Sequence, residues 1–327
     1  MSVKDRVRVL SLACCVTAIA ALAGLTFASG AGAFTLGNTY LALGDSLTYG
    51  FHAAQFNEEL KEGKVNPASF NDGFVDDFSA ALRHFNPNLK TINDGCPGET
   101  SETFLKGSGL PFPGFCAGGP TGTPFPYSFL HHPYTTGSQM SDALAILAAN
   151  PHVSPISVDI GANDVLQFLE HTCGFPTTDT CNEEQIIGEY EHIAANLGTI
   201  LTKLRAAAPH AQIVVLGNYN PFPTVIPGPP GGDKQLAELN NLLAKTTGKT
   251  HGASFISVEP AFNPGGFFFG EKAEVLDIPT ICAFTAMCPG GTFNPASPEA
   301  DIHPTKKGYQ VMANFELISF LTHNGSL

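Results

Sequence analysis

A serine at the end of an apolar run is the first residue in this chain that could do chemistry. In YLALGDSLTYGF, residues 40–51, the apolar stretch ends at Leu43 and is followed directly by Gly44, Asp45 and Ser46. Glycine, aspartate and serine all favour turns, so the tripeptide alone is compatible with a simple turn. The alternative is that Ser46 is a nucleophile, which would need a base for its proton and donors for an oxyanion.

Residues of the required types occur in three further short blocks. They are NDGCPGETS (93–101) with Gly98, GAND (161–164) with Asn163, and ADIHPTKKGY (300–309) with Asp301 and His303. A histidine can act as the base, and a side-chain amide can donate to an oxyanion without carrying a charge. A glycine lets a main-chain N–H approach the reacting centre closely. The three blocks are therefore candidate partners of Ser46.

Short apolar runs of strand length alternate with longer stretches of helical periodicity. We predict strands over Thr39–Leu43, Lys90–Asn93, Ile156–Ile160, Gln212–Leu216 and Phe255–Val258, and helices over about 74–84, 139–149, 183–207, 233–248 and 306–322. This alternation favours a mostly parallel sheet with helices on both faces. Such sheets bind ligands beyond the carboxyl ends of their strands, and Ser46 lies just past the first predicted strand.

The four blocks together resemble the motifs of the SGNH (GDSL) hydrolase family. They are Gly-Asp-Ser-Leu, Asn-x-Gly-x-x-Gly, Gly-x-Asn-Asp and Asp-x-His-Pro-Thr, found in the family's order, and GNYNPFP at 217–223 resembles a further family element. The likeness spans residues 39 to about 320. It implies a flavodoxin-like three-layer α/β/α sandwich with a mostly parallel five-stranded sheet. It also implies a serine ester hydrolase that needs no metal or organic cofactor.

The resemblance assigns a role to each candidate residue. Ser46 matches the nucleophile and His303 matches the general base. The main-chain N–H groups of Ser46 and Gly98, with the side-chain amide of Asn163, match the oxyanion hole.

The acid is the point at which this sequence departs from the family pattern. The family's common position, three residues before the histidine, is Ala300 here, whereas Asp301 lies two residues before His303. Either the Asp301 carboxylate or the Ala300 carbonyl could orient the imidazole. We favour Asp301, because only a carboxylate stabilises an imidazolium by a full charge.

The beginning of the chain is typical of a secretory signal. Three basic residues fall within the first eight positions, an apolar run continues to about Ala28, and Ala-Gly-Ala at 31–33 has the small-x-small form of a cleavage site. We interpret residues 1–33 as a signal peptide and 34–327 as a single SGNH hydrolase domain that is secreted and extracellular. An uncleaved anchor is the alternative, because such a run could just span a bilayer. No later segment is long and apolar enough to do so.

Cysteine usage agrees with export. Six cysteines follow the predicted cleavage site: Cys96, Cys116, Cys173, Cys181, Cys282 and Cys288. An even number in an exported chain predicts disulfides, and of the possible pairings three consecutive pairs is the simplest. No Cys-x-x-Cys occurs, and no histidine pair has metal-ligand spacing with acidic support, so we predict no metal site. The net charge of −13 opposes binding to nucleic acid or to anionic membranes.

Two long segments, residues 105–138 and 262–300, are rich in proline, glycine and phenylalanine. Their cysteines and phenylalanines predict ordered, disulfide-stapled loops rather than linkers. The phenylalanines also favour an apolar acyl pocket, and hence fatty-acyl or other lipid esters as substrates. Three alternatives stay open: a carbohydrate O-acetyl esterase, an acyltransferase, and a secreted binding protein on the same scaffold without turnover.

Overall fold

The computed structural model describes residues 36–108, 115–116, 125–134, 137–174, 181–223, 232–270 and 275–322. The predicted signal peptide, residues 1–33, lies outside the described residues. Phe34–Leu327 forms one compact unit. Among the helices described, none combines the length and the apolar composition needed to cross a membrane.

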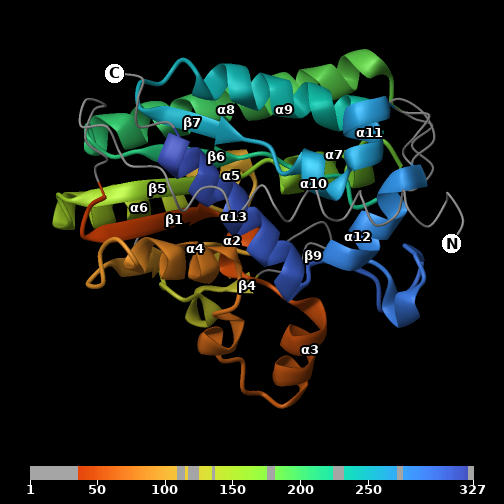
Figure 1. Cartoon of the computed structure of the whole chain (residues 1–327), viewed down its shortest axis with the longest axis horizontal. Coiled ribbons are helices and arrows are strands. Elements are labelled where there is room, and N and C mark those ends of the chain that lie inside the picture. Colours follow the sequence, from red (N-terminus) through yellow and green to blue (C-terminus); the bar gives the residue numbers. More distant parts are fainter. Residues whose placement is uncertain are drawn as a thin grey trace, which may run out of the picture. The chain divides into compact units, whose positions relative to one another are not determined.

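Five parallel strands form the central sheet. Their spatial order is β2 (Lys90–Asn93), β1 (Thr39–Gly44), β5 (Val153–Asp159), β6 (Ile213–Leu216) and β7 (Ala253–Ile256) (Figure 1). All four strand pairings are parallel. The predicted parallel five-stranded sheet is confirmed, with each strand end within three residues of the expected position.

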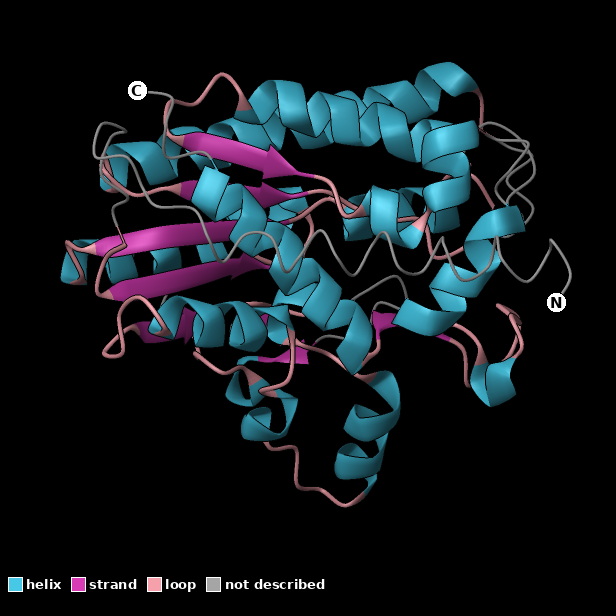
Figure 2. Ribbon diagram, in the orientation of Figure 1, coloured by secondary structure: helices cyan, strands magenta, loops and turns pink. Residues whose placement is uncertain are grey.

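Helices cover both faces of the sheet because side chains alternate along each strand. In β1, Leu41 and Leu43 pack in a core with α6 (Gln139–Ala149), α8 (Glu183–Ala207) and α9 (Asp233–Thr247). Tyr40 and Ala42 pack in a second core with α4 (Phe74–Arg83) and α13 (Lys306–Thr322). Figures 1 and 2 show α4 and α13 on the face of the sheet turned toward the viewer. The predicted three-layer sandwich is confirmed.

Short helices cluster at the carboxyl edge of the sheet, and most were not expected from the sequence. They are α2 (Ser46–Tyr49), α3 (Ala53–Lys61), α5 (Ser101–Lys106), α7 (Ala162–His171) and α10 (Glu259–Phe262). Each of α2, α5, α7 and α10 follows a strand of the sheet in the chain. The candidate residues near 46, 98 and 163 are therefore brought to one edge of the molecule.

The two segments expected as long loops contain more regular structure than predicted. The first holds the short antiparallel pair β3 (Phe115–Cys116) and β4 (Phe125–Pro126), and a 3₁₀ turn at Tyr127–Phe129. The second holds α11 (Pro264–Phe269), α12 (Ile278–Phe284), a 3₁₀ turn at Pro289–Gly291 and β8 (Thr285–Ala286). Strand β8 pairs antiparallel with β9 (Asp301–Pro304), outside the main sheet.

Three disulfides join consecutive cysteines. The pairs are Cys96–Cys116, Cys173–Cys181 and Cys282–Cys288, with Cα–Cα distances of 5.8, 4.8 and 5.1 Å. The simplest of the possible pairings is thus the one that the structure has. Cys96 and Cys116 are buried in an aromatic cluster with Tyr49, Phe70 and Phe125.

Candidate active site

Ser46 is positioned by the sharp end of β1. Gly44 has φ +148°, and a Cβ at this position would lie 2.2 Å from the main-chain oxygen of Asp159, so only glycine fits. Asp45 then caps α2, its Oδ1 accepting a hydrogen bond of 2.9 Å from the Leu47 N–H. Ser46 is consequently the first residue of a helix, where main-chain N–H groups have no partner within the helix.

His303 and Asp301 come to Ser46 from strand β9. Residues two apart in a strand point to the same side, so the Asp-x-His spacing places the carboxylate beside the imidazole. Asp301 Oδ1 lies 2.5 Å from His303 Nδ1, and His303 Nε2 lies 2.8 Å from Ser46 Oγ. The structure therefore joins the three predicted side chains in one continuous chain of hydrogen bonds, with Asp301 and not the Ala300 carbonyl at the imidazole.

The Asp301 carboxylate is held in its ionised form. Its Oδ2 accepts a hydrogen bond of 3.0 Å from the Ala53 N–H at the start of α3, and its Oδ1 accepts one of 3.1 Å from the His303 N–H. Burial alone would raise the pKa of Asp301. The attraction of His303 and these hydrogen bonds outweigh burial and hold this pKa well below its usual value.

The side-chain amide of Asn163 is held by two acceptors. Its Nδ2 donates to Asp45 Oδ2 and to the Glu99 carbonyl oxygen, both at 3.1 Å. Because both partners accept, the NH₂ group and not the amide oxygen must face them. The amide is thereby fixed between the loop that carries Ser46 and the loop that carries Gly98.

Gly98 adopts a left-handed conformation, with φ +83°, one residue before Glu99. Within the described part of the chain, neither the Gly98 N–H nor the Ser46 N–H donates a hydrogen bond. Gly98 is buried but is not among the residues that line the cavity beside Ser46.

Gln139 is a positioning residue that the sequence did not reveal. Its Oε1 accepts from the Gly44 N–H at 2.7 Å, and its Nε2 donates to the Gly44 oxygen at 2.8 Å. The same Nε2 contacts the Tyr134 hydroxyl at 2.6 Å, and the Cys96 N–H donates to the Gly44 oxygen at 3.0 Å. The buried Gln139 amide thus holds both the N–H and the carbonyl of Gly44, just before the Asp45–Ser46 turn. No local pattern signals it, because 95 positions separate the two residues.

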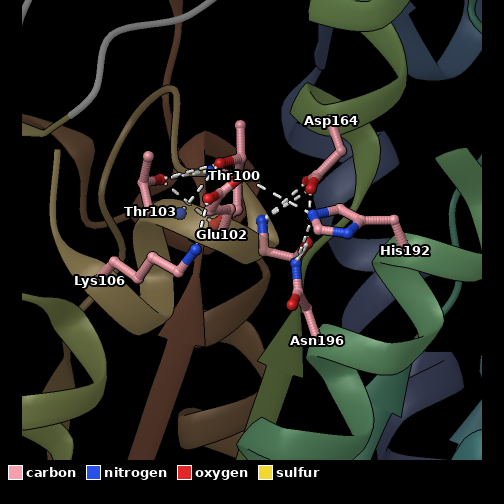
Figure 3. Close-up of polar contacts among 8 residues, drawn as sticks. Thr100, Glu102, Thr103, Lys106, Asp164, His192 and Asn196 are labelled. Carbon is pink, nitrogen blue, oxygen red and sulfur yellow. Dashed lines mark hydrogen bonds and ion pairs between the residues drawn. The ribbon is translucent and has the colours of Figure 1, made fainter. Parts of the chain in front are cut away.

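A second polar network fixes the helix that follows the Gly98 loop (Figure 3). Asp164 Oδ1 accepts from the Ser101 hydroxyl at 2.5 Å, and Asp164 Oδ2 accepts from the Ser101 N–H at 2.8 Å. Asn196 Nδ2 donates to the Ser101 hydroxyl at 3.0 Å. Figure 3 shows Asp164, His192 and Asn196 approaching α5 from the neighbouring helices. These contacts tie α5 to α7 and α8, and so restrict movement of the Gly98 loop.

His132 has acidic partners that its sequence position does not suggest. Its Nδ1 lies 3.0 Å from Asp94 Oδ1 and 3.3 Å from Asp142 Oδ2. The hydrogen bond with Asp94 raises the pKa of His132, and burial raises the pKa of Asp94 to about 7. The prediction from the sequence concerned histidine pairs only, and it could not reveal this contact because the partners come from separate segments. The buried carboxyl groups of Asp94 and Asp142 thus both lie close to one ring nitrogen of His132.

An apolar cavity of about 100 Å³ opens beside Ser46 and His303. Much of its apolar lining comes from helices α7, α8 and α9, and Leu47, Phe222 and Ile302 add to it. The helical residues are Val165, Leu166, Leu169, Tyr190, Leu236 and Leu239. The expectation that the phenylalanines of the long segments form this pocket was wrong for those described. Phe125 packs in the aromatic cluster of Cys96, and Phe267, Phe268 and Phe269 are exposed. Phe112 and the side chain of Phe115 lie outside the description.

The structure thus combines a three-layer sandwich with a serine hydroxyl that contacts an imidazole beyond the carboxyl edge of the sheet. The family model for the GDSL-like lipase/acylhydrolase family matches residues 132–311, which is more than half of the chain. The chain belongs to this family. The matched region contains Asn163, Asp301 and His303, and it begins after Ser46 and Gly98. A comparison with curated proteins finds no match.

Several solved structures are similar to this chain. A lipase from a goat rumen metagenome is 20% identical, with 86% of this chain and 96% of that chain covered and a TM-score of 0.49. Phospholipase A1 from Streptomyces albidoflavus NA297 is 16% identical, with 88% and 100% covered and a TM-score of 0.49. A carbohydrate acetylesterase from Sinorhizobium meliloti is 14% identical, with 86% and 96% covered and a TM-score of 0.43.

Proposed function

We propose that this chain is a secreted serine carboxylic-ester hydrolase that acts on fatty-acyl esters through an acyl-enzyme. The observation that carries the proposal is the continuous contact from Asp301 through His303 to Ser46 at the mouth of an apolar cavity. A serine becomes a nucleophile when a base accepts its proton, and the base works best when a third group orients it.

The first half of the reaction forms the acyl-enzyme. Ser46 Oγ attacks the ester carbonyl carbon while His303 Nε2 accepts the hydroxyl proton. Asp301 stabilises the resulting imidazolium from the Nδ1 side. The tetrahedral intermediate then collapses, the carbon–oxygen bond to the leaving alcohol breaks, and His303 returns the proton to that alcohol.

The developing oxyanion needs donors that are already in place. We assign this role to the main-chain N–H groups of Ser46 and Gly98 and to the Asn163 amide. The first two make no other hydrogen bond within the described chain. Asn163 would share a hydrogen that now points to Asp45 or to the Glu99 carbonyl. Water, activated by His303, then hydrolyses the acyl-enzyme on the same groups.

The acyl chain of the substrate fits the lining of the cavity. Leucine and valine side chains of α7 and α9 offer apolar surface directly beside Ser46, which favours a hydrocarbon chain over a sugar ring. A carbohydrate O-acetyl esterase needs room for one methyl group only on the acyl side. Substrate chain length therefore separates the two functions.

Export is proposed from the signal-like residues 1–33 and from the three disulfides, which persist in oxidising compartments. Detection of the chain beginning at or near Phe34 in culture supernatant would support cleavage and secretion. Recovery of the intact chain with the membrane fraction would instead support the uncleaved anchor.

The function is tested with a panel of nitrophenyl esters from acetyl to palmitoyl, hydrolysed by the wild type and by Ser46→Ala. We expect turnover of octanoyl and longer esters by the wild type and its collapse in Ser46→Ala, with the far-UV spectrum unchanged. Turnover of acetyl esters only would support the carbohydrate esterase. Equal rates of hydrolysis by the two proteins would show that Ser46 is not the nucleophile. No hydrolysis by either protein would support a binding protein. Transfer to added alcohols would reveal an acyltransferase.

A further inference from the structure

Apolar side chains exposed to solvent gather in one short part of this molecule. Of the eight large apolar side chains that are exposed among the described residues, five fall between positions 267 and 276. They are Phe267, Phe268 and Phe269 on α11, with 47, 63 and 73% of their surface exposed, and Val275 and Leu276, with 56 and 55%. The other three, Leu60, Phe85 and Ile318, are far apart in the sequence. We call the five residues the aromatic patch.

The two parts of the aromatic patch are fixed to one another. Asp277, which is fully buried, follows Leu276 directly. Its carboxylate accepts hydrogen bonds from the Gly265 N–H and, at 3.2 Å, from the Gly266 N–H in the first turn of α11. Because this contact anchors the chain just after Leu276 to the start of α11, the exposed side chains before and after residues 271–274 belong to one surface region. Residues 271–274 themselves lie outside the description.

The phenylalanines contact one another rather than a core. The rings of Phe267 and Phe268 are 4.9 Å apart, centroid to centroid, and those of Phe268 and Phe269 are 6.4 Å apart. None of the three belongs to a buried core cluster of the described chain. Single exposed apolar residues are ordinary, but a contiguous group of this kind marks a surface for interaction.

The aromatic patch lies one helix away from the candidate active site. One side of α9 lines the cavity beside Ser46 with Leu236 and Leu239. Another side of α9 lines a depression against α11 with Lys234, Ala237 and Asn241, together with Phe267 and Phe269. A helix with its side chains is about 10 Å across. Figure 1 shows α10 and α11 beyond the carboxyl end of β7, at the same edge of the sheet as α7.

We propose that the aromatic patch binds the surface of a neutral or zwitterionic lipid aggregate, and so holds the cavity mouth near the lipid from which acyl chains are taken. The inference rests on the proposed function for its choice of lipid as the partner. Charge supports that choice. The stretch AFNPGGFFFG, residues 261–270, carries no charged side chain, whereas Glu271, Lys272 and Glu274 stand between it and Val275 in the sequence. A net charge of −13 repels both anionic membranes and a second copy of this chain. Aromatic side chains are favoured at such lipid interfaces.

The test measures binding and hydrolysis separately. Ser46→Ala protein, which cannot consume lipid, is sedimented with phosphatidylcholine vesicles and with vesicles rich in phosphatidylglycerol. The same binding is measured for two further variants of the Ser46→Ala protein. One carries both Phe268→Ser and Phe269→Ser, and the other carries Phe85→Ser. Phe85 is the matched control because it is also an exposed phenylalanine, at 53%.

We expect binding to phosphatidylcholine that falls about tenfold or more when both patch phenylalanines are replaced, since burying a single phenylalanine corresponds to about tenfold in affinity. Phe85→Ser should bind as its parent does, and phosphatidylglycerol vesicles should bind less. With Ser46 restored, the doubly substituted protein should hydrolyse a soluble short-chain ester at the wild-type rate and lose activity only on emulsified lipid.

Three results would overturn the proposal. One is the absence of any vesicle binding, and another is an equal loss of binding in Phe85→Ser. The third is a dimer, measured by light scattering, that the two patch substitutions dissociate, because it would make the aromatic patch an interface between copies. If soluble esters are not hydrolysed while vesicles are still bound through the aromatic patch, the proposed catalytic function is wrong and the proposed lipid binding by the patch is retained.

Discussion

His303 Nε2 lies 2.8 Å from Ser46 Oγ, although 257 positions separate the two residues in the chain. Ser46 follows β1 of the central sheet, whereas His303 lies on β9, which within the described residues pairs with β8 and not with the central sheet. The contact therefore depends on how two separate parts of the fold are held together. Tyr219 contributes to this by donating its hydroxyl hydrogen to the Ile302 oxygen at 2.5 Å.

Replacing Asp301 tests which group orients the base. We expect Asp301→Asn to keep the fold and to lower kcat by a factor on the order of 10³–10⁴. The imidazolium of His303 loses its counter-charge, and the neutral ring is no longer held in the tautomer that leaves Nε2 free to accept a proton. Glu299→Gln, two residues away and exposed, is the control and should behave as the wild type. Steady-state kinetics on a nitrophenyl ester measure both. Near-full activity in Asp301→Asn would indicate that the Ala300 carbonyl, and not Asp301, orients the imidazole of His303.

Truncating Asn163 tests the oxyanion assignment. Asn163→Ala removes one donor and should lower kcat by ~10²–10³ with a smaller change in KM, because the interaction is made chiefly in the transition state. Asn57→Ala, at an exposed position on α3, is the matched control. A rise in KM at constant kcat would show instead that the amide binds the ground state.

The buried carboxyl group of Glu99 should make the free energy of unfolding depend on pH. Burial raises the pKa of Glu99 from 4.5 to about 8. A carboxyl group whose pKa is raised by folding stabilises the fold below its unfolded pKa, and this contribution is lost as the pH rises toward the folded pKa. The free energy of unfolding should therefore fall between about pH 4.5 and 8.

Glu99→Gln should make that decline shallower and raise stability at pH 9 by at least ~1.4 kcal/mol, the equivalent of one pKa unit. Urea denaturation at pH 5, 7 and 9 measures the effect. Glu102→Gln, where the side chain is half exposed, serves as the control. A Glu99→Gln protein with an unchanged pH profile would contradict the prediction.

The Cys96–Cys116 disulfide should matter more to activity than to the sheet. It holds the start of the Gly98 loop, and the Cys96 N–H also donates to the Gly44 oxygen before Ser46. We expect the variant with Cys96→Ala and Cys116→Ala to lose activity at temperatures where its far-UV spectrum is still that of a folded protein. The variant with Cys173→Ala and Cys181→Ala, which removes a bridge beyond α7, should lose less. Activity and far-UV signal that decline together would oppose this.

The sequence predicted those features that depend on local pattern. Strand β6 and helix α8 stand where expected because apolar residues repeat with the period of each element. The capping box of Asn182 with Gln185 at the start of α8 is another feature of local spacing, with hydrogen bonds of 3.0 and 3.1 Å. The contact of Ser46 with His303 could be expected because four blocks in order indicated a known family.

Features that depend on contacts between distant segments could not be predicted in this way. Gln139 opens a helix with an ordinary amphipathic pattern, and nothing local shows that its amide faces Gly44. Phenylalanines of the long segments looked alike in the sequence, yet Phe125 is buried and Phe269 is exposed. Helix α7 was missed because its first turn was interpreted as a site motif, although Val165, Phe168 and Leu169 follow helical spacing.

The two-residue pairing of β8 with β9 has a consequence for engineering. Asp301 and His303, the proposed acid and base, lie together on a two-stranded ribbon that, in the described part of the chain, shares no strand with the central sheet. Under the proposed function, exchanging this ribbon between relatives would exchange the groups that accept and return the proton and would leave Ser46 unchanged. Libraries confined to β8 and the Cys282–Cys288 disulfide are therefore expected to change the rate while the helices that line the cavity stay unchanged.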